Sequence, residues 1–144
     1  MRATVCILAL LVSACTAGRS VPHPRVVAPG VEFQLNLGER VGTTGGEFLI
    51  LFERVLEDSR CPMNARCISE GNAKIVVRVK EFAATPGERI RSISSTLELN
   101  TSERFPKRQS FGKFDVVLVH LEPTPMTGEK VEKYVATLRV EWQP

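Results

Sequence analysis

The stretch EDSRCPMNARCISEGNA, residues 57–73, separates two apolar runs and holds two of the four cysteines of the chain. Cys61 and Cys67 are six positions apart, and Pro62 and Asn64 between them favour a turn that reverses the chain. Such a turn brings Cα atoms to the roughly 4.4–6.8 Å that a disulfide requires. The sequence therefore predicts a Cys61–Cys67 disulfide, which stabilises the fold by roughly 2–2.5 kcal/mol for so short a loop. A pair of metal thiolates is the weaker alternative, because structural metal sites usually need four ligands and the nearby sequence offers no second pair.

The runs on either side of this stretch have the character of β-strands. Residues 47–55 (EFLILFERV) are densely apolar, which predicts a central strand covered on both faces. Residues 72–82 (NAKIVVRVKEF) alternate apolar and polar side chains. This period of two predicts a strand whose inward face carries Ala73, Ile75, Val77 and Val79.

The two ends of the remaining chain also alternate. Residues 31–37 predict a half-buried strand, and residues 134–142 predict the strand that closes the fold. The inward residues of the first strand are expected to be Val31, Phe33, Leu35 and Leu37. Those of the second are expected to be Tyr134, Ala136, Leu138, Val140 and Trp142.

Between them, residues 90–99 and 114–121 predict two more strands, and residues 109–113 predict either a short edge strand or a turn. In the run FDVVLVHL, residues 114–121, His120 is expected on the face opposite Val117, Val119 and Leu121.

No segment shows a long apolar period of 3.6 residues, so the sequence lacks the crossover helices that parallel βαβ units need. Short strands separated by Gly and Pro turns predict an all-β domain, a single antiparallel β-sandwich or open barrel of about 6–8 strands. The predicted domain covers residues 31–144.

The first residues have the pattern of a secretory leader. A basic start at Arg2 is followed by an apolar run, residues 5–12, which is too short to span a bilayer as a helix. The run Val12-Ser13-Ala14-Cys15 then resembles the lipobox of bacterial lipoproteins. The resemblance implies that residues 1–14 are a signal peptide, and that Cys15 carries a diacylglycerol thioether and an acylated amino group. It also accounts for Cys15, which would otherwise be an odd exposed thiol.

Residues 15–30 are expected to be the lipidated cysteine and a flexible linker, because residues 16–30 contain three prolines and two glycines. Thr16 stands where the family places an aspartate in proteins retained at the inner membrane. The resemblance therefore implies a lipid-anchored protein of the cell envelope, at the outer membrane and facing the periplasm.

The central stretch carries a second resemblance. The pattern F-x-x-V-x-x-D-S-R-C-P, then Cys67, then G-x-A runs from Phe52 to Ala73. It is similar to a motif of small secreted bacterial proteins and lipoproteins of unknown function, which implies a shared β-fold. Those proteins often have an aromatic residue close after the second cysteine, where this chain has Ile68 and Ser69.

Charge and composition narrow the function classes. The net charge is +3 and no basic stripe with interleaved aromatics occurs, so nucleic-acid binding is not expected. The sequence has no nucleophile elbow and no glycine-rich phosphate loop before a helix. His120 is the one histidine of the predicted domain and has no local metal-ligand spacing around it. We therefore expect no catalysis, no cofactor and no metal.

The cysteine stretch allows a structural and a functional interpretation. In the structural one, Asp58 and Ser59 bond to the turn backbone, Arg60 reaches Glu57, Asp58 or Glu70, and Gly71 adopts a positive φ. In the functional one, the rigid loop presents residues to another envelope protein or a small ligand. The candidate partner-binding residues are Arg60, Met63, Asn64 and Arg66. A non-catalytic binding or structural module is the leading hypothesis. The alternatives are a hydrolase inhibitor that presents residues 61–67 and a small enzyme or metal-binding protein that uses His120.

Overall fold

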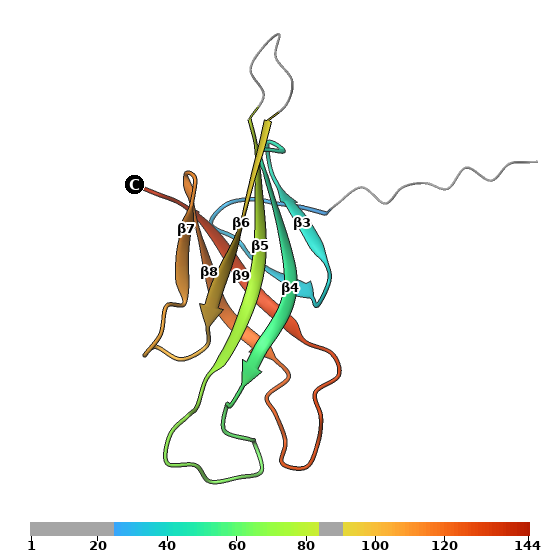
Figure 1. Ribbon diagram of the computed structural model, residues 1–144, viewed down its shortest axis with the longest axis vertical. Helices are drawn as coiled ribbons and strands as arrows, with labels where there is room; N and C mark the ends of the chain where they lie inside the picture. Colours follow the sequence, from blue (N-terminus) through green and yellow to red (C-terminus); the bar gives the residue numbers. More distant parts are fainter. Residues whose placement is uncertain (1–24, 84–90) are drawn as a thin grey trace, which may run out of the picture.

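The computed structural model describes residues 25–83 and 91–144, and this part of the chain contains strands and loops without a helix (Figure 1). The strands are β1 Arg25–Val27, β2 Glu32–Asn36, β3 Arg40–Thr43, β4 Phe48–Asp58, β5 Ala73–Ala83, β6 Arg91–Asn100, β7 Arg108–Phe111, β8 Phe114–Glu122 and β9 Val135–Trp142.

The strands form two sheets that pack face to face. The first has the order β1-β3-β4-β5-β6 and the second the order β2-β9-β8-β7. Neighbouring strands are antiparallel except β1 and β3, which are parallel. The prediction of an all-β sandwich is confirmed. The sheets do not close into a barrel, and the described strands number nine, more than expected. β1 lies in the segment predicted as linker, and β3 lies in a segment for which no strand was predicted.

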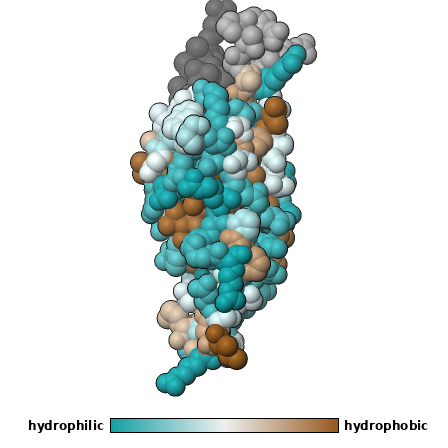
Figure 2. Space-filling model, turned by 90° about the vertical axis from the view of Figure 1, so that its left-hand side faces the viewer, coloured by the Kyte–Doolittle hydropathy of each residue, from teal (hydrophilic) through white to brown (hydrophobic). Residues whose placement is uncertain are grey.

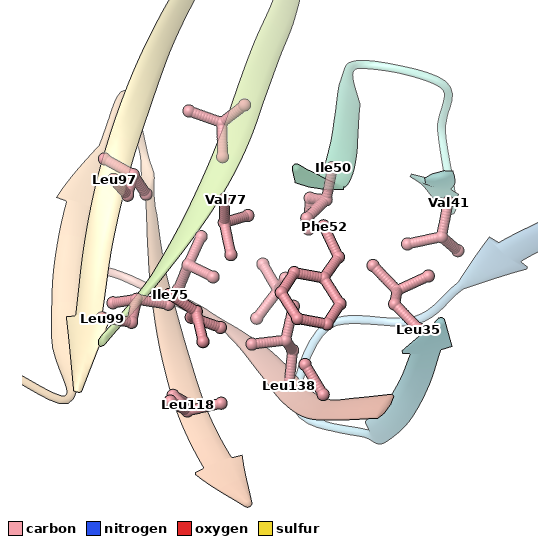
Figure 3. Close-up of a cluster of buried hydrophobic side chains, with 14 of the residues drawn as sticks. Leu35, Val41, Ile50, Phe52, Ile75, Val77, Leu97, Leu99, Leu118 and Leu138 are labelled. Atoms are coloured by element: carbon pink, nitrogen blue, oxygen red, sulfur yellow. The ribbon is translucent and has the colours of Figure 1, made fainter. Parts of the chain in front are cut away.

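The core lies between the sheets and is built from the inward residues of both (Figure 3). β4 is the middle strand of its sheet, as predicted, and its inward residues Phe48, Ile50 and Phe52 are buried. Leu49 and Leu51, on its other face, are only half-buried, so the prediction that both faces are covered is wrong. The predicted inward face of β5 is confirmed, and that of β9 is confirmed at its centre. The buried residues there are Ala73, Ile75, Val77, Val79, Ala136, Leu138 and Val140. The prediction is wrong for Trp142, at the end of β9, which is 56% exposed.

The N-terminal part of the described chain departs from expectation at two points. Arg25–Val27, predicted as linker, form β1 and pair with residues 41–43 of β3. The strand predicted over residues 31–37 is shorter, and Val31 and Leu37 are exposed while Phe33 and Leu35 are buried. The outer two positions lie beyond the ladder to β9, which runs from Glu32 to Asn36.

In β8, the alternation of buried and more exposed side chains is interrupted near the middle of the strand. Its pairing to β9 shifts between Leu118 and His120, which marks a β-bulge. Val116, Leu118 and Leu121 are buried, whereas Val117 and Val119 are only half-buried. The prediction that Val117, Val119 and Leu121 share one face is therefore wrong, because the extra residue of the bulge reverses the alternation between Val117 and Leu121. His120 is exposed, as predicted.

Candidate functional site

The candidate site is the connection between β4 and β5, residues 58–72, which we call the cysteine corner. It projects from the lower end of the sandwich in Figure 1, beside the loop between β8 and β9. The sulfur atoms of Cys61 and Cys67 lie 2.12 Å apart and their Cα atoms 5.9 Å apart. The predicted disulfide is thus present, and it closes the outer part of the corner.

A largely buried ion pair holds the first residues of the corner. The Arg60 guanidinium donates to both carboxylate oxygens of Asp58, from Nε to Oδ1 at 2.8 Å and from Nη2 to Oδ2 at 2.6 Å. It also donates to the carbonyl of Leu121, and at 2.7 Å to the carbonyl of Pro123. The side chains of Arg60 and Asp58 are 11% and 9% exposed. The expectation that Arg60 is presented to a partner is therefore wrong, because the fold uses its guanidinium to join β4 to the end of β8.

The ion pair also shifts the acidity of its neighbours. Burial raises the pKa of Asp58, but the hydrogen bonds and charge of Arg60 outweigh this effect and leave that pKa below its ordinary value. The hydroxyl of Tyr134 donates to Asp58 Oδ2 at 3.2 Å. Burial, followed by the charge of Asp58, raises the pKa of Tyr134. Asp58 thus stays a carboxylate, and it connects the end of β4 directly to Tyr134 and, through Arg60, to the end of β8.

The corner returns to β5 through a tight approach of two backbone segments. Gly71 has a φ of +71°, as predicted, and a Cβ placed there would lie 1.9 Å from the carbonyl oxygen of Ser59. Ser59 N–H donates to the Asn72 carbonyl at 2.7 Å, and Cys61 N–H donates to the Glu70 carbonyl at 2.8 Å. Only glycine permits this ladder, because any side chain would collide with backbone atoms.

Asn72 connects the corner to the loop that follows β6. Its side chain is buried, and Nδ2 donates to Asn100 Oδ1 at 2.9 Å. Its Oδ1 accepts from the backbone N–H groups of Thr101 and Ser102 at 3.2 and 3.1 Å. The Ser102 hydroxyl in turn donates to Glu70 at 3.0 Å. The sequence analysis did not predict this network. The local feature that pointed to it is the Gly71-Asn72 pair directly before β5.

The tip of the corner remains exposed although its backbone is held. Met63 N–H donates to the Pro125 carbonyl at 2.9 Å, and Asn64 Oδ1 accepts from Thr127 N–H at 2.8 Å. Asn64 is thus partly engaged by the neighbouring loop. Met63 is 71% exposed and Ile68 is fully exposed, and Arg66 lies exposed between them in the sequence. Figure 2 shows apolar and hydrophilic atoms side by side at this lower end of the molecule.

His120 lies near the base of the corner. Together with Glu70, Ser102 and Thr124 it lines a shallow groove of ≈ 390 Å³. No group of three or more His, Cys, Asp or Glu side chains within residues 25–83 and 91–144 is placed to hold a metal ion. The groove therefore offers a histidine, a carboxylate and hydroxyls for hydrogen bonding.

The two aromatic residues of the segment predicted as the closing strand, Tyr134 just before β9 and Trp142 at its end, have different environments. Tyr134 packs against the core and bonds to Asp58. Trp142 is 56% exposed, and its ring centroid lies 4.3 Å from that of Phe114.

The predicted signal peptide and the lipidation at Cys15 lie outside the described residues. Within the described part, no helix is long and apolar enough to cross a membrane. Comparison with protein-family models, with curated proteins and with solved structures finds no match to this chain.

Proposed function

We propose that this protein is a lipid-anchored, non-catalytic binding module of the cell envelope, which contacts a partner protein through the tip of the cysteine corner. The observation that carries the proposal is the contrast between a loop held by the disulfide and by backbone bonds at Cys61, Met63 and Ala65, and side chains that are exposed on it. These side chains are Met63, Arg66 and Ile68. A loop that is already ordered loses little conformational entropy on binding, so exposed apolar side chains on it contribute more of their burial to affinity.

The Cys61–Cys67 disulfide supports a location in the cell envelope. Disulfides persist in secreted and periplasmic proteins and are rare in the reducing cytosol. A Cys61–Cys67 disulfide therefore agrees with export, and the lipobox-like run that ends at Cys15 is the basis for the lipid anchor and for the outer membrane. Mass spectrometry of the N-terminal peptide tests the anchor. A peptide beginning at a diacylglyceryl Cys15 is expected, and an unmodified N-terminus would overturn the anchor.

Photo-crosslinking in intact cells tests the binding surface. A photoreactive residue at position 68 should capture one envelope protein reproducibly. The same residue at position 54, an exposed site on the outer face of β4, is the matched control and should not capture it. With the photoreactive residue placed at position 66, the chain should capture the same envelope protein. The additional changes Met63→Ser and Ile68→Ser should weaken capture from position 66 without lowering the melting temperature. Equal capture from positions 54 and 68 would contradict the proposal.

A hydrolase inhibitor that presents residues 61–67 is the second candidate, because the disulfide and the bonds to residues 125–127 hold this loop rigidly. Replacing Met63 and Arg66 together by alanine should then abolish inhibition of the target hydrolase while the melting temperature stays unchanged. The groove with His120 and Glu70 is the basis of the enzyme or metal-binding alternative. His120→Ala distinguishes it, since this change should leave the phenotype of a binding module intact and remove that of an enzyme.

A further inference from the structure

The four edge strands of the two sheets differ in length. β1, β7 and β2 have three, four and five residues, whereas β6 has ten. An edge strand presents unpaired N–H and C=O groups that can pair with another chain, and short edges limit such pairing. β6 is therefore the edge of the described fold on which a further strand has most room to add.

The direction of the backbone groups of β6 follows from two bonds near its end. The Glu98 carbonyl accepts from Gln109 Nε2 at 2.8 Å, and Asn100 N–H donates to the Pro106 carbonyl at 3.0 Å, both away from β5. Backbone groups alternate along a strand, so Ser92, Ser94 and Thr96 also direct theirs away from β5. No strand within residues 25–83 and 91–144 pairs with this side of β6.

The open half of β6 lacks the features that usually prevent edge pairing. Residues 92–97 (SISSTL) contain no charge and no proline, and the pairing of β6 to β5 is continuous without a bulge. Residues 91–96 are exposed on both faces, and the apolar side chain of Ile93 is 65% exposed. The edge is thus regular, uncharged and partly apolar.

We propose that this edge is a dimer interface, in which β6 of a second copy pairs antiparallel with β6 about a two-fold axis at Ile93. In this register Ile93 lies opposite its own counterpart. Ser92 lies opposite Ser94 of the second copy, and the two such pairs exchange about four N–H···O bonds. Arg91 lies opposite Ser95 of the second copy, so no like charges face each other across the axis.

The residues of β6 favour a second copy of this chain as the partner, and they favour the register centred on Ile93. An isologous interface requires a surface that complements itself, and a central isoleucine flanked by serines does so. A register centred nearer Glu98 would place the second strand against Gln109, which already occupies that carbonyl. Antiparallel pairing also sets the two cysteine corners at opposite ends of the dimer. The interface is therefore independent of the proposed binding surface and leaves it free.

Disulfide trapping tests the register on the full-length chain in intact cells. Under copper–phenanthroline and dioxygen, Ile93→Cys should give a covalent dimer on a non-reducing gel at least ten times more abundant than Ser95→Cys. Position 95 is exposed on the same face, but its two copies would be about 13 Å apart along the strands. Wild type measures the background from the native cysteines. Equal trapping at positions 93 and 95, or trapping at 95 alone, would overturn the proposal.

Sedimentation of the purified full-length protein in mild detergent tests association without a new cysteine. Wild type and Ile93→Leu should sediment as dimers. Ile93→Lys, which sets two charges on the axis, should raise the dimer dissociation constant at least tenfold. Because the side chain is largely exposed, the melting temperature of the lysine variant should match that of the leucine variant at a concentration where both are monomeric. A monomeric wild type, or an unchanged dimer in the lysine variant, would refute the interface.

Discussion

Asp58 and Arg60 form a two-point ion pair at the end of β4, and the same guanidinium binds two carbonyl groups near the end of β8. The pair thereby ties one sheet to the other where the cysteine corner begins. Removing one partner of a buried pair leaves an uncompensated charge, which costs about 3–5 kcal/mol.

Arg60→Ala should consequently lower the free energy of unfolding by about 3 kcal/mol, because the Asp58 carboxylate and two carbonyl groups lose their donor. Arg66→Ala is the matched control in the same loop. Arg66 is exposed, so its loss should change stability by no more than about 0.5 kcal/mol. Urea denaturation of both variants measures the difference. Similar losses in the two would show that the ion pair does not stabilise the fold.

The lowered pKa of Asp58 predicts a dependence of stability on pH. A carboxylate whose pKa is lower in the folded state binds protons less readily there than in the unfolded chain. Its contribution is therefore complete above the ordinary aspartate pKa of 3.8 and is lost as the pH falls through the folded value. Denaturation curves between pH 5 and pH 2 should show a smaller decline for Asp58→Asn than for wild type. Asp115, whose pKa is lowered by its Ser110 hydrogen bond, should supply part of the remaining decline.

Gly71→Ala should destabilise the protein more than an alanine at an unhindered glycine. Both Gly71 and Gly128 have a positive φ, which costs an L-residue roughly 1–2 kcal/mol. A Cβ at Gly128 meets nothing within 4 Å, whereas one at Gly71 collides with the backbone of Ser59. We expect a loss of about 1 kcal/mol for Gly128→Ala and at least about 3 kcal/mol for Gly71→Ala. Thermal denaturation checks the ranking, which equal losses would contradict.

Removing the disulfide should cost roughly 2–2.5 kcal/mol, the entropy of closing a seven-residue loop. The variant Cys61→Ser, Cys67→Ser measures this by urea denaturation. Thiol labelling of the denatured, unreduced wild-type protein should find neither Cys61 nor Cys67. The backbone amide protons of Met63 and Thr127, which bond to Pro125 and to Asn64, should exchange with solvent faster in the variant. Labelling of both thiols in wild type would show that the disulfide does not form in the cell.

Several features followed from the sequence because they depend on neighbouring residues. The alternation in residues 72–82 predicted the buried face of β5, since side chains of a strand alternate between its faces. The spacing of Cys61 and Cys67 predicted the disulfide, since a short turn suffices to bring them together. The positive φ of Gly71 also followed from its place at the entry to a strand.

Other features were decided by contacts between residues far apart in the sequence. β1 exists because β3 offers it a partner, and the bulge at Val119 exists because β9 sets the register of β8. Arg60 was predicted as a partner-binding residue, yet the carbonyl groups of Leu121 and Pro123 enclose it. By itself the sequence determined the longer strands, the turn and the disulfide, through local alternation and spacing, but not β1 and β3. Only the tertiary structure decided which charged side chain is buried and which edge stays open, because both depend on which segments the fold brings together.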